Sequence, residues 1–389
     1  MSHALLSPSA ASRWLNCTPS ARLEEQFPDR AGAAAAEGTT AHALAEILIS
    51  QALGTDKAFK LNARLKEVQD SSFYNEDMHE HCDNYVALVL ERYAEAQRRT
   101  KDPVIFLERR IDLSAYVPEG FGTGDAVIIA DGLMDIIDLK YGKGVPVSAI
   151  ENKQMMLYAL GLVHEFELIY LLERVRMTIY QPRIDNVSSF EMAVDDLKRW
   201  AEDELKPKAA MAFAGIGEYQ AGSHCQFCKA KGICRAFADY NLVLARHEFK
   251  QPELLNDEEV AEILDKAATF TNWLNAVKDH ALSEALNGKE WPGYKLVEGR
   301  SNRKFTDEEQ VAGKLMELGY KEEDIYNKKL QGITALEKMV GKAAFTTHLG
   351  GYTVKPPGAP TLVPQSDKRP AINSEQAAKA EFADVETNL

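Results

Sequence analysis

Basic residues are in deficit in this sequence of 389 residues: 45 Lys and Arg stand against 59 Asp and Glu, a formal net charge of −14. This balance excludes a protein that coats nucleic acid or an anionic lipid surface through bulk positive charge. It leaves open an enzyme that handles DNA at a local site, where metal ions neutralise the phosphates.

Cysteine and long apolar runs are also scarce. The five cysteines are too few for a disulfide-stapled fold of this length, and their odd number is typical of a reducing compartment. No run approaches about 18 consecutive apolar residues, so the sequence predicts no membrane span and no membrane partner. The first residues lack the basic and apolar regions of a signal peptide. We therefore expect a soluble protein of the cytoplasm.

Apolar residues are abundant, at 45% of the chain, which is enough for a buried core and a second module. Their spacing changes along the chain between the helical period and the strand period of two. This order of elements predicts an α/β fold with a mixed central sheet flanked by helices. The predicted elements are helices over 40–48 and 78–98, strands over 104–111, 126–129 and 134–140, a helix over 148–165, a strand over 175–181 and a helix over 195–214.

Local signals mark some of the boundaries. Thr39 or Thr40 is the expected N-cap of the first helix, and Asp131-Gly132 is a hairpin signal between the second and third strands. Composition divides the chain further, because the last residues are rich in Pro, Ser and Ala and poor in large apolar side chains. The expected regions are a folded domain over 1–240, a mainly helical accessory region over 241–355 and an extended or flexible tail over 356–389.

Two carboxylates stand beside a lysine on neighbouring predicted strands. Asp125 begins one strand, whereas Asp138 and Lys140 lie two residues apart on the next, so that both side chains share a face. Carboxylate oxygens there would bind Mg²⁺ or Mn²⁺, and the ammonium would orient or deprotonate a water. A solvated surface pair is the alternative. The apolar neighbours of Asp138 favour a buried carboxylate that needs a partner such as a metal.

Further polar residues occupy the predicted helices. His42 lies one turn before Glu46, where a neutral imidazole would complete a site built mainly from carboxylates. An ordinary helix histidine is the alternative. Gln154 and Tyr158 are four residues apart and share a helix face. This polar pair either faces a substrate or the active site, or it merely belongs to an ordinary amphipathic helix without a functional role.

A cysteine motif of the form C-x2-C-x5-C comprises Cys225, Cys228 and Cys234. Close thiols in a reducing compartment indicate zinc or an iron–sulfur cluster, and both of these usually take a fourth ligand. Cys17, in a loop-like Asn-Cys-Thr-Pro context, is the candidate, with His224 as the runner-up. Cys82 is expected to be a helix residue without a ligand role.

Together these motifs resemble the PD-(D/E)XK nuclease superfamily, specifically its RecB-like branch that carries an iron–sulfur cluster. The C-x2-C-x5-C motif, paired with one cysteine far upstream, is similar to the cluster staple of AddB-type helicase–nucleases and CRISPR-associated exonucleases. The motif of a helicase P-loop does not occur, so the chain looks most like a stand-alone, phage-encoded version. The matching stretches are the run ending at Cys17, Gly38-Thr39-Thr40-Ala41-His42, Gly122-Thr123-Gly124-Asp125, Ile137-Asp138-Leu139-Lys140-Tyr141-Gly142-Lys143-Gly144, Gln154-Met155-Met156-Leu157-Tyr158 and the C-x2-C-x5-C motif.

The resemblance implies a restriction-endonuclease-like core with an iron–sulfur staple. It also implies roles for single residues. Lys140 would position or activate the attacking water, and Gln154 and Tyr158 would contact DNA or order the site. The implied ligands of Mg²⁺ or Mn²⁺ are His42, Asp125, Asp138 and the carbonyl of Leu139. The implied ligands of a [4Fe–4S] cluster are Cys17, Cys225, Cys228 and Cys234.

The activity implied by the resemblance is that of a metal-dependent DNA exonuclease in phage recombination, replication or repair. Its partners would be single- or double-stranded DNA ends and a single-strand-binding or recombination protein, and an oligomer is compatible with the sequence. The location would be the cytoplasm of the host. The leading alternative is a catalytically quiet module with the same fold that grips DNA ends or recruits a partner. A zinc-ribbon scaffold is the third reading.

Overall fold

The computed structural model describes residues 4–28, 33–144, 146–242, 257–295, 297, 308–317, 321–326 and 332–353. The chain divides into two compact units, Met1–Pro292 and Gly293–Leu389. The first unit holds the sheet and every candidate site residue. The expected tail over 356–389 lies outside the described residues.

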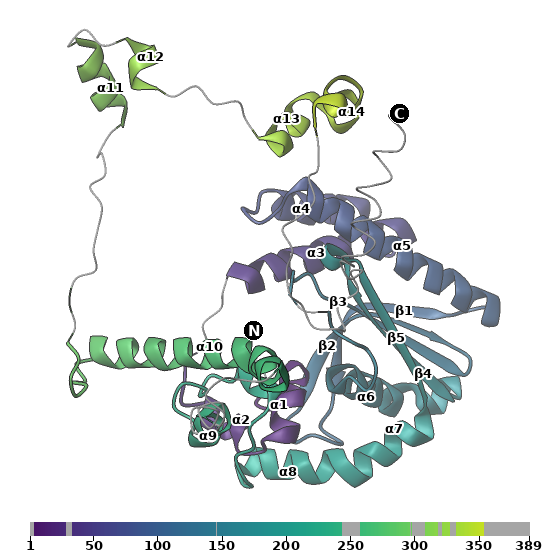
Figure 1. Cartoon of the computed structure of the whole chain (residues 1–389). Helices are drawn as coiled ribbons and strands as arrows, with labels where there is room; N and C mark the ends of the chain where they lie inside the picture. Colours follow the sequence, from purple (N-terminus) through teal and green to yellow (C-terminus); the bar gives the residue numbers. More distant parts are fainter. Residues whose placement is uncertain are drawn as a thin grey trace, which may run out of the picture. The chain divides into compact units, whose positions relative to one another are not determined.

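A mixed sheet forms the centre of the first unit (Figure 1). Its strands are hydrogen-bonded in sequence order. Three of the pairings are antiparallel, whereas β3 and β4 run parallel, because α6 crosses over between them. The predicted mixed sheet is thus confirmed. The strands in the described residues are β1 (Val104–Asp112), β2 (Phe121–Ala130), β3 (Leu133–Leu139), β4 (Arg174–Gln181) and β5 (Asn186–Ala193).

Helices cover both faces of this sheet (Figure 1). On one face α3 and α5 pack over Ala126 and Ile128 of β2. On the other face α6 packs over Val127 and Ile136, together with α1, α7 and α8. The bounds in the first unit are α1 (Ala11–Asn16), α2 (Ser20–Glu24), α3 (Ala33–Leu53), α4 (Ala58–Gln69), α5 (Glu76–Arg99), α6 (Lys153–Tyr170), α7 (Val194–Trp200), α8 (Lys206–Ala214), α9 (Arg235–Leu242) and α10 (Asp257–Leu286), with short turns η1 (Pro8–Ala10), η2 (Pro182–Ile184), η3 (Ala201–Leu205) and η4 (Ser223–Phe227).

The hairpin between β2 and β3 forms at the predicted turn. Ala130 pairs with Leu133 across the turn, and Gly132 adopts a φ of 76°, which glycine reaches without steric cost. Every residue of β3 is buried, since helices lie on both of its faces. This strand therefore has no solvent-facing side, and any charge on it needs a partner inside the protein.

The expected N-cap at Thr39 or Thr40 is wrong. α3 begins at Ala33, so both threonines lie inside the helix. Their hydroxyls each donate to a carbonyl one turn earlier, at Ala35 and Ala36, over 3.0 Å. Alanine has the highest helix propensity of all residue types, and four alanines precede Glu37 and Gly38. They extend the helix toward its N-terminus.

The fifth strand, β5, was not among the predicted elements. It is an edge strand that pairs only with β4 among the described strands. Val187 is exposed, and the next apolar side chains, Phe190 and Met192, are only half-buried. Its hydrophobic alternation is therefore weak, because one side of the pairing ladder is open to solvent.

The C-terminal region is helical where it is described. Its helices belong to the second unit, whereas α10 belongs to the first, so the expected boundary near residue 240 falls inside the first unit. A Cβ placed on Gly232 would lie 2.6 Å from the Ala276 carbonyl oxygen, which shows how closely α10 packs on the cysteine-motif segment. The second-unit helices are α11 (Glu308–Glu317), α12 (Glu322–Ile325), α13 (Ile333–Val340) and α14 (Lys342–Leu349), followed by the turn η6 (Gly350–Tyr352).

None of the helices in the described ranges combines the length and the apolar character that crossing a bilayer requires.

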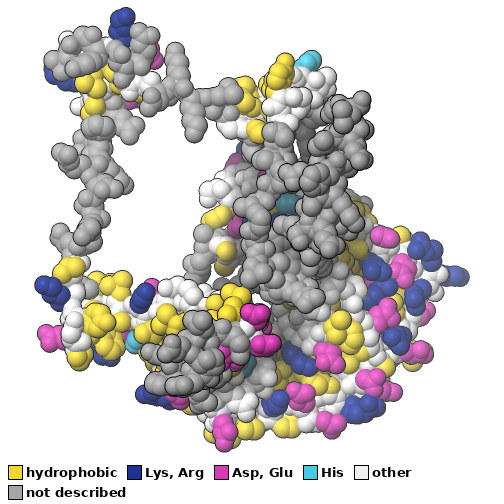
Figure 2. Space-filling model, viewed as in Figure 1, with side chains coloured by type: hydrophobic (Ala, Val, Ile, Leu, Met, Phe, Trp, Pro, Cys, Tyr) yellow, Lys and Arg dark blue, Asp and Glu magenta, His cyan; other side chains and the backbone are white. Residues whose placement is uncertain are grey.

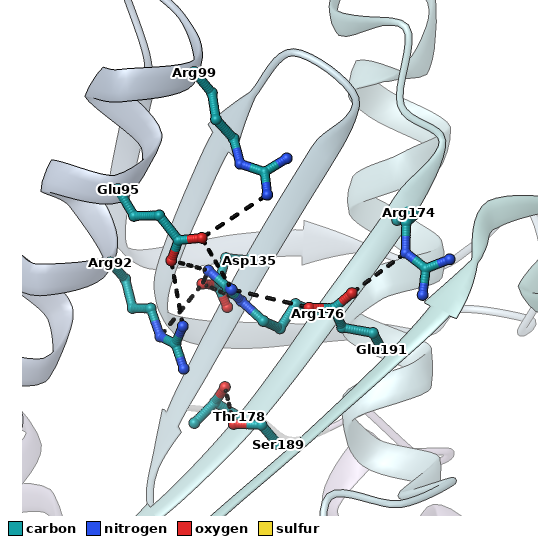
Figure 3. Close-up of polar contacts among 9 residues, drawn as sticks. All are labelled: Arg92, Glu95, Arg99, Asp135, Arg174, Arg176, Thr178, Ser189 and Glu191. Atoms are coloured by element: carbon teal, nitrogen blue, oxygen red, sulfur yellow. Dashed lines mark hydrogen bonds and ion pairs between the residues drawn. The ribbon is translucent and has the colours of Figure 1, made fainter.

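A buried ion network fastens α5 to the sheet (Figure 3). Arg176 of β4 donates from Nε and Nη2 to Asp135 Oδ2 of β3, over 2.8 and 2.6 Å. The same Nη2 donates to Glu95 Oε2 of α5 over 3.0 Å. Burial raises the pKa of Asp135, which Arg176 opposes. Since the Asp135 side chain is only 4% exposed, its charge depends on the guanidinium.

Replacement of one partner should be costly. We expect Asp135→Ala to lower the free energy of unfolding by about 1–3 kcal/mol, because the buried Nε of Arg176 would lose its acceptor while the guanidinium kept only the more exposed Glu95 and Glu191. Urea denaturation followed by circular dichroism measures the change. The matched control is Asp196→Ala, which breaks an exposed pair with Arg199 and should cost about 0–1 kcal/mol. Equal losses in the two variants would contradict the role of the network.

Candidate active site

The candidate site lies at the C-terminal end of β3, beside Asp125 in the middle of β2. The Leu139 N–H donates to Asp125 Oδ2 over 2.7 Å, so Asp125 lies beside the end of β3, as the predicted pairing of the two strands requires. Lys140 directly follows β3, and its N–H donates to the Tyr180 carbonyl of β4 over 2.8 Å. The lysine backbone is thereby held by the parallel neighbour of its own strand.

On one side of the site, Asp138 and Lys140 form a buried pair with α6. Asp138 is 2% exposed, and its Oδ2 lies 3.0 Å from Lys140 Nζ. Lys140 Nζ also donates to Gln154 Oε1 over 3.1 Å. Gln154 Nε2 in turn donates to Tyr158 OH over 3.0 Å and lies 3.5 Å from Asp138 Oδ1. The shared face of Gln154 and Tyr158 thus turns to the acidic strand.

The electrostatics of this pair follow from burial and mutual attraction. Burial raises the pKa of Asp138, which the ammonium of Lys140 opposes. Burial lowers the pKa of Lys140, but the charges of Asp138 and Asp125 raise it by more, so the pKa lies above its ordinary value. Asp138 Oδ2 lies at ion-pair distance from Lys140, yet no donor among the described residues makes a well-directed hydrogen bond to it. This buried oxygen keeps coordinating capacity for a cation.

On the other side of the site, α3 brings His42 to the carboxylates. Nδ1 of His42 lies 3.3 Å from Asp125 Oδ1 and 3.7 Å from Glu108 Oε1. Burial lowers the pKa of His42, but Asp125 and Glu108 raise it to about 10. A proton on Nδ1 is therefore favoured between the two carboxylates, and the imidazole must release it before this nitrogen can bind a cation.

Glu108 is a site residue that the sequence analysis missed. It lies in β1, and its neighbours pair with the residues on either side of Asp125, as Leu107 with Ala126 and Arg109 with Gly124. Glu108 therefore faces Asp125 across the two strands. In the sequence it is one of three consecutive charged residues, Glu108-Arg109-Arg110, in a predicted strand. Only the register of β1 on β2 distinguishes it from the others.

The donor set suits a hard divalent cation. One ligand atom each of His42, Glu108 and Asp125 lies within 4.8 Å of the others, and carboxylate oxygens with one imidazole nitrogen fit Mg²⁺ or Mn²⁺. Asp138 is outside this group, although its charge acts on both His42 and Lys140. Leu139 contributes its N–H to Asp125; a role for its carbonyl stays a prediction.

The four candidate cluster cysteines line one cavity. They come from segments far apart in the chain: the loop after α1, the turn η4 and the loop before α9. His224 also lines this cavity, with Nε2 2.9 Å from the Gln220 carbonyl oxygen. Burial raises the pKa of Cys228 to about 12, so the thiols must release protons to bind a metal. These cysteines are Cys17, Cys225, Cys228 and Cys234.

Polar contacts hold the two halves of this cavity together. Glu24 Oε1 accepts from the Lys229 N–H over 2.7 Å, and Glu24 Oε2 accepts from Arg13 Nε over 2.7 Å. Thr18 Oγ1 donates to the Ile216 carbonyl over 2.7 Å. The N-terminal segment is thus fixed against the cysteine motif by the protein's own hydrogen bonds.

Cys82 lies apart from that cavity. It is a fully buried residue of α5, as predicted for a helix residue. Its Sγ donates to the Ala41 carbonyl of α3 over 3.5 Å, and it packs in the core between these helices and the sheet.

The first glycine of the Gly-Thr-Gly-Asp stretch makes room for Tyr158. A Cβ on Gly122 would lie 2.6 Å from Tyr158 Cε1 and 2.9 Å from Pro8 Cγ. Non-bonded carbon atoms do not approach one another this closely. The Tyr158 ring would therefore have to move, and Gln154, which is hydrogen-bonded to it, would move with it.

Gly122→Ala should therefore destabilise the fold by about 1–3 kcal/mol, the range for overpacking a core. Urea denaturation measures the loss. Gly144→Ala is the matched control, since no atom lies within 4 Å of its added Cβ. The loss should shrink in a Tyr158→Ala background, and an unchanged loss there would contradict the Tyr158 contact.

The fold and the site define a mixed α/β protein with a carboxylate–lysine site and a histidine at one end of its sheet. The chain matches a family model over residues 3–370 and belongs to that family, which is described as protein of unknown function (DUF2800). Among solved structures, one titled "Crystal structure of SSO0001" is similar at 14% identity and a TM-score of 0.24, over 58% of this chain and 84% of that chain.

Proposed function

We propose that the protein is a metal-dependent deoxyribonuclease that hydrolyses phosphodiester bonds at DNA ends. The observation that carries the proposal is the meeting of Asp125 of β2 with Asp138 and Lys140 at the C-terminal end of β3. Paired carboxylates beside a lysine match the needs of metal-assisted phosphodiester hydrolysis. The resemblance of the motifs to RecB-like nucleases supports the same reaction.

His42, Asp125 and Asp138, with the carbonyl of Leu139, would hold Mg²⁺ or Mn²⁺. The bound ion would polarise the scissile phosphate and acidify a water. The donor set and the coordinating capacity left on Asp138 Oδ2 fit such an ion.

Lys140 is placed to act on the attacking water and on the charge of the phosphate. Its Nζ lies between Asp138 Oδ2 and Gln154 Oε1, which leaves one ammonium proton for a water or a phosphate oxygen. Gln154 fixes this position, because its amide also donates to Tyr158 OH. Gln154 and Tyr158 of α6 thus orient Lys140. If these two side chains also contacted DNA, the contact would change the position of the lysine.

The charge of the chain limits how DNA is held. In Figure 2, Lys and Arg side chains are interspersed with Asp and Glu over the side formed by α5, α7 and α8, rather than gathered by sign. With a net charge of −14, non-specific affinity through counterion release would be low. Contacts at the metal and at single basic residues would therefore do most of the binding.

Asp138→Asn and Lys140→Met should each lower the rate of DNA cleavage by at least about 100-fold, because each removes a charge next to the reacting phosphate. The rate is measured on 5′- and 3′-labelled single- and double-stranded DNA with Mg²⁺ or Mn²⁺. Circular dichroism checks that the variants fold.

The controls are Asp131→Asn, on the exposed turn of the same hairpin, and Lys101→Met, on the exposed loop before β1. Both should cut DNA as the wild type does. Full activity of Asp138→Asn or Lys140→Met would contradict the site. A wild type that binds DNA ends without cutting them would favour the catalytically quiet module instead.

We also propose that the four cavity cysteines hold a [4Fe–4S] cluster. A single zinc ion with about 2.3 Å bonds places its thiolate sulfurs about 3.8 Å apart. Among the described residues, no three of these thiols lie within 4.8 Å of one another. A wider spacing suits a cluster, in which several irons and sulfides lie between the thiolates.

Such a cluster would have a structural role. It would join Cys17 to a motif about two hundred residues later in the chain, and closing a long loop removes more conformational entropy from the unfolded chain. Because the ligands meet only in the folded state, cluster binding would add to folding stability.

Cys17→Ala should remove most of the broad absorption near about 400 nm that an iron–sulfur cluster gives. The protein is purified without oxygen, and iron is measured together with the spectrum. Cys82→Ala is the matched control, since it removes a buried cysteine outside the cavity and should keep the absorption. A colourless wild type with stoichiometric zinc would contradict the cluster.

A further inference from the structure

We propose that Glu108 is an additional ligand of the divalent cation, and that the cation lies on the His42 side of the site, bound by α3, β1 and β2 together. The inference rests on the proposed function for the presence of a cation, but it concerns where and how that ion is bound. Neither the motifs nor the resemblance assigns a role to this glutamate.

The first argument is the direction of the free carboxylate oxygens. Asp125 Oδ2 accepts from the Leu139 N–H, so Oδ1 is the oxygen that remains, and it faces His42 Nδ1 at 3.3 Å. Glu108 Oε1 lies 3.7 Å from the same nitrogen. A cation that uses Asp125 Oδ1 therefore comes within reach of Glu108.

The second argument is how Asp138 is occupied. Its Oδ2 is paired with Lys140 Nζ at 3.0 Å, and Gln154 Nε2 lies 3.5 Å from its Oδ1. It is not part of the group whose ligand atoms lie within 4.8 Å of one another, whereas Glu108 is. The site thus has two sides. His42, Glu108 and Asp125 form its exposed side, and Asp138, which also pairs with Lys140, would bind the same cation from the buried side.

Access is the third argument. The Glu108 and His42 side chains are 33% and 30% exposed, whereas that of Asp138 is 3% exposed. An ion that keeps several of its waters, as Mg²⁺ and Mn²⁺ do, needs an open position. The exposed side of the site offers that position, and a phosphate oxygen could replace one of the waters there.

The backbone of Glu108 supplies the means for a clean test. Its φ is 47°, in the left-handed region that L-residues rarely adopt within a strand. Glu119 has the same feature, with a φ of 54°, but is exposed and lies in the loop between β1 and β2, beyond the last strand pair of Asp112 with Phe121. Glu119→Gln therefore controls for both the backbone conformation and the loss of one negative charge.

The experiment titrates the full-length protein with Mn²⁺ alone and follows free Mn²⁺ by electron paramagnetic resonance. Glu108→Gln should weaken Mn²⁺ binding by about tenfold or more, because the neutral amide is a poorer ligand for a hard cation. Glu119→Gln should bind within about twofold of the wild type, the range of an ordinary surface change. The Mn²⁺-induced rise in melting temperature should follow the same order.

Glu108→Gly guards against a variant that fails to fold, because glycine adopts a positive φ without steric cost. It should fold and lose the Mn²⁺-induced rise as Glu108→Gln does. Three outcomes overturn the inference: Glu108→Gln binds Mn²⁺ as the wild type does, both glutamine variants weaken it equally, or the wild type binds no Mn²⁺ at millimolar concentration.

DNA cleavage measured in parallel separates this inference from the proposed function. If Mn²⁺ binding depends on Glu108 but the wild type cuts no DNA, the nuclease proposal fails and the ligand assignment stands. If the wild type cuts DNA and Glu108→Gln keeps full Mn²⁺ affinity, the ligand assignment fails and the nuclease proposal stands.

Discussion

The hydrogen bond from the Leu139 N–H to Asp125 Oδ2, at 2.7 Å, is the contact on which the site depends. It joins the end of β3 to the middle of β2 and fixes the rotation of the Asp125 carboxylate. Because one oxygen is taken by the backbone, the other turns to His42 of α3. Without this contact the acids would lie on the same hairpin but would not share an orientation.

The burial of β3 explains why its two aspartates have such different surroundings. Asp135 and Asp138 are three residues apart, so they point to opposite faces of the sheet. Neither face is open to water, and a buried carboxylate needs a partner. Asp135 finds the guanidinium of Arg176, which fastens α5 to the sheet. Asp138 is paired with the ammonium of Lys140. The same need for charge balance thus places a carboxylate and an ammonium together in the candidate site.

The N-terminal segment belongs structurally to the end of the first unit. Arg13, Thr18 and Glu24 make hydrogen bonds to residues 216–229, and these contacts bring Cys17 to the cysteine motif. These contacts involve protein groups only. A cluster would then strengthen an existing junction, because it stabilises only the state in which its ligands already meet.

The sequence by itself determined the features that depend on neighbours in the chain. These include the alternation that makes β1 to β4, the Asp131-Gly132 turn and the shared face of Gln154 and Tyr158, each of which is set by local periodicity or turn chemistry. The early start of α3 likewise follows from the local helix propensity of the alanines before Gly38. Tertiary structure alone decided the position of Glu108, because strand register selects which charge faces Asp125. It also decided that β5 forms, since pairing with β4 outweighed weak local signals. The physical reason is that strand pairing brings together residues that are far apart in the sequence, and local sequence patterns do not specify which of these residues meet.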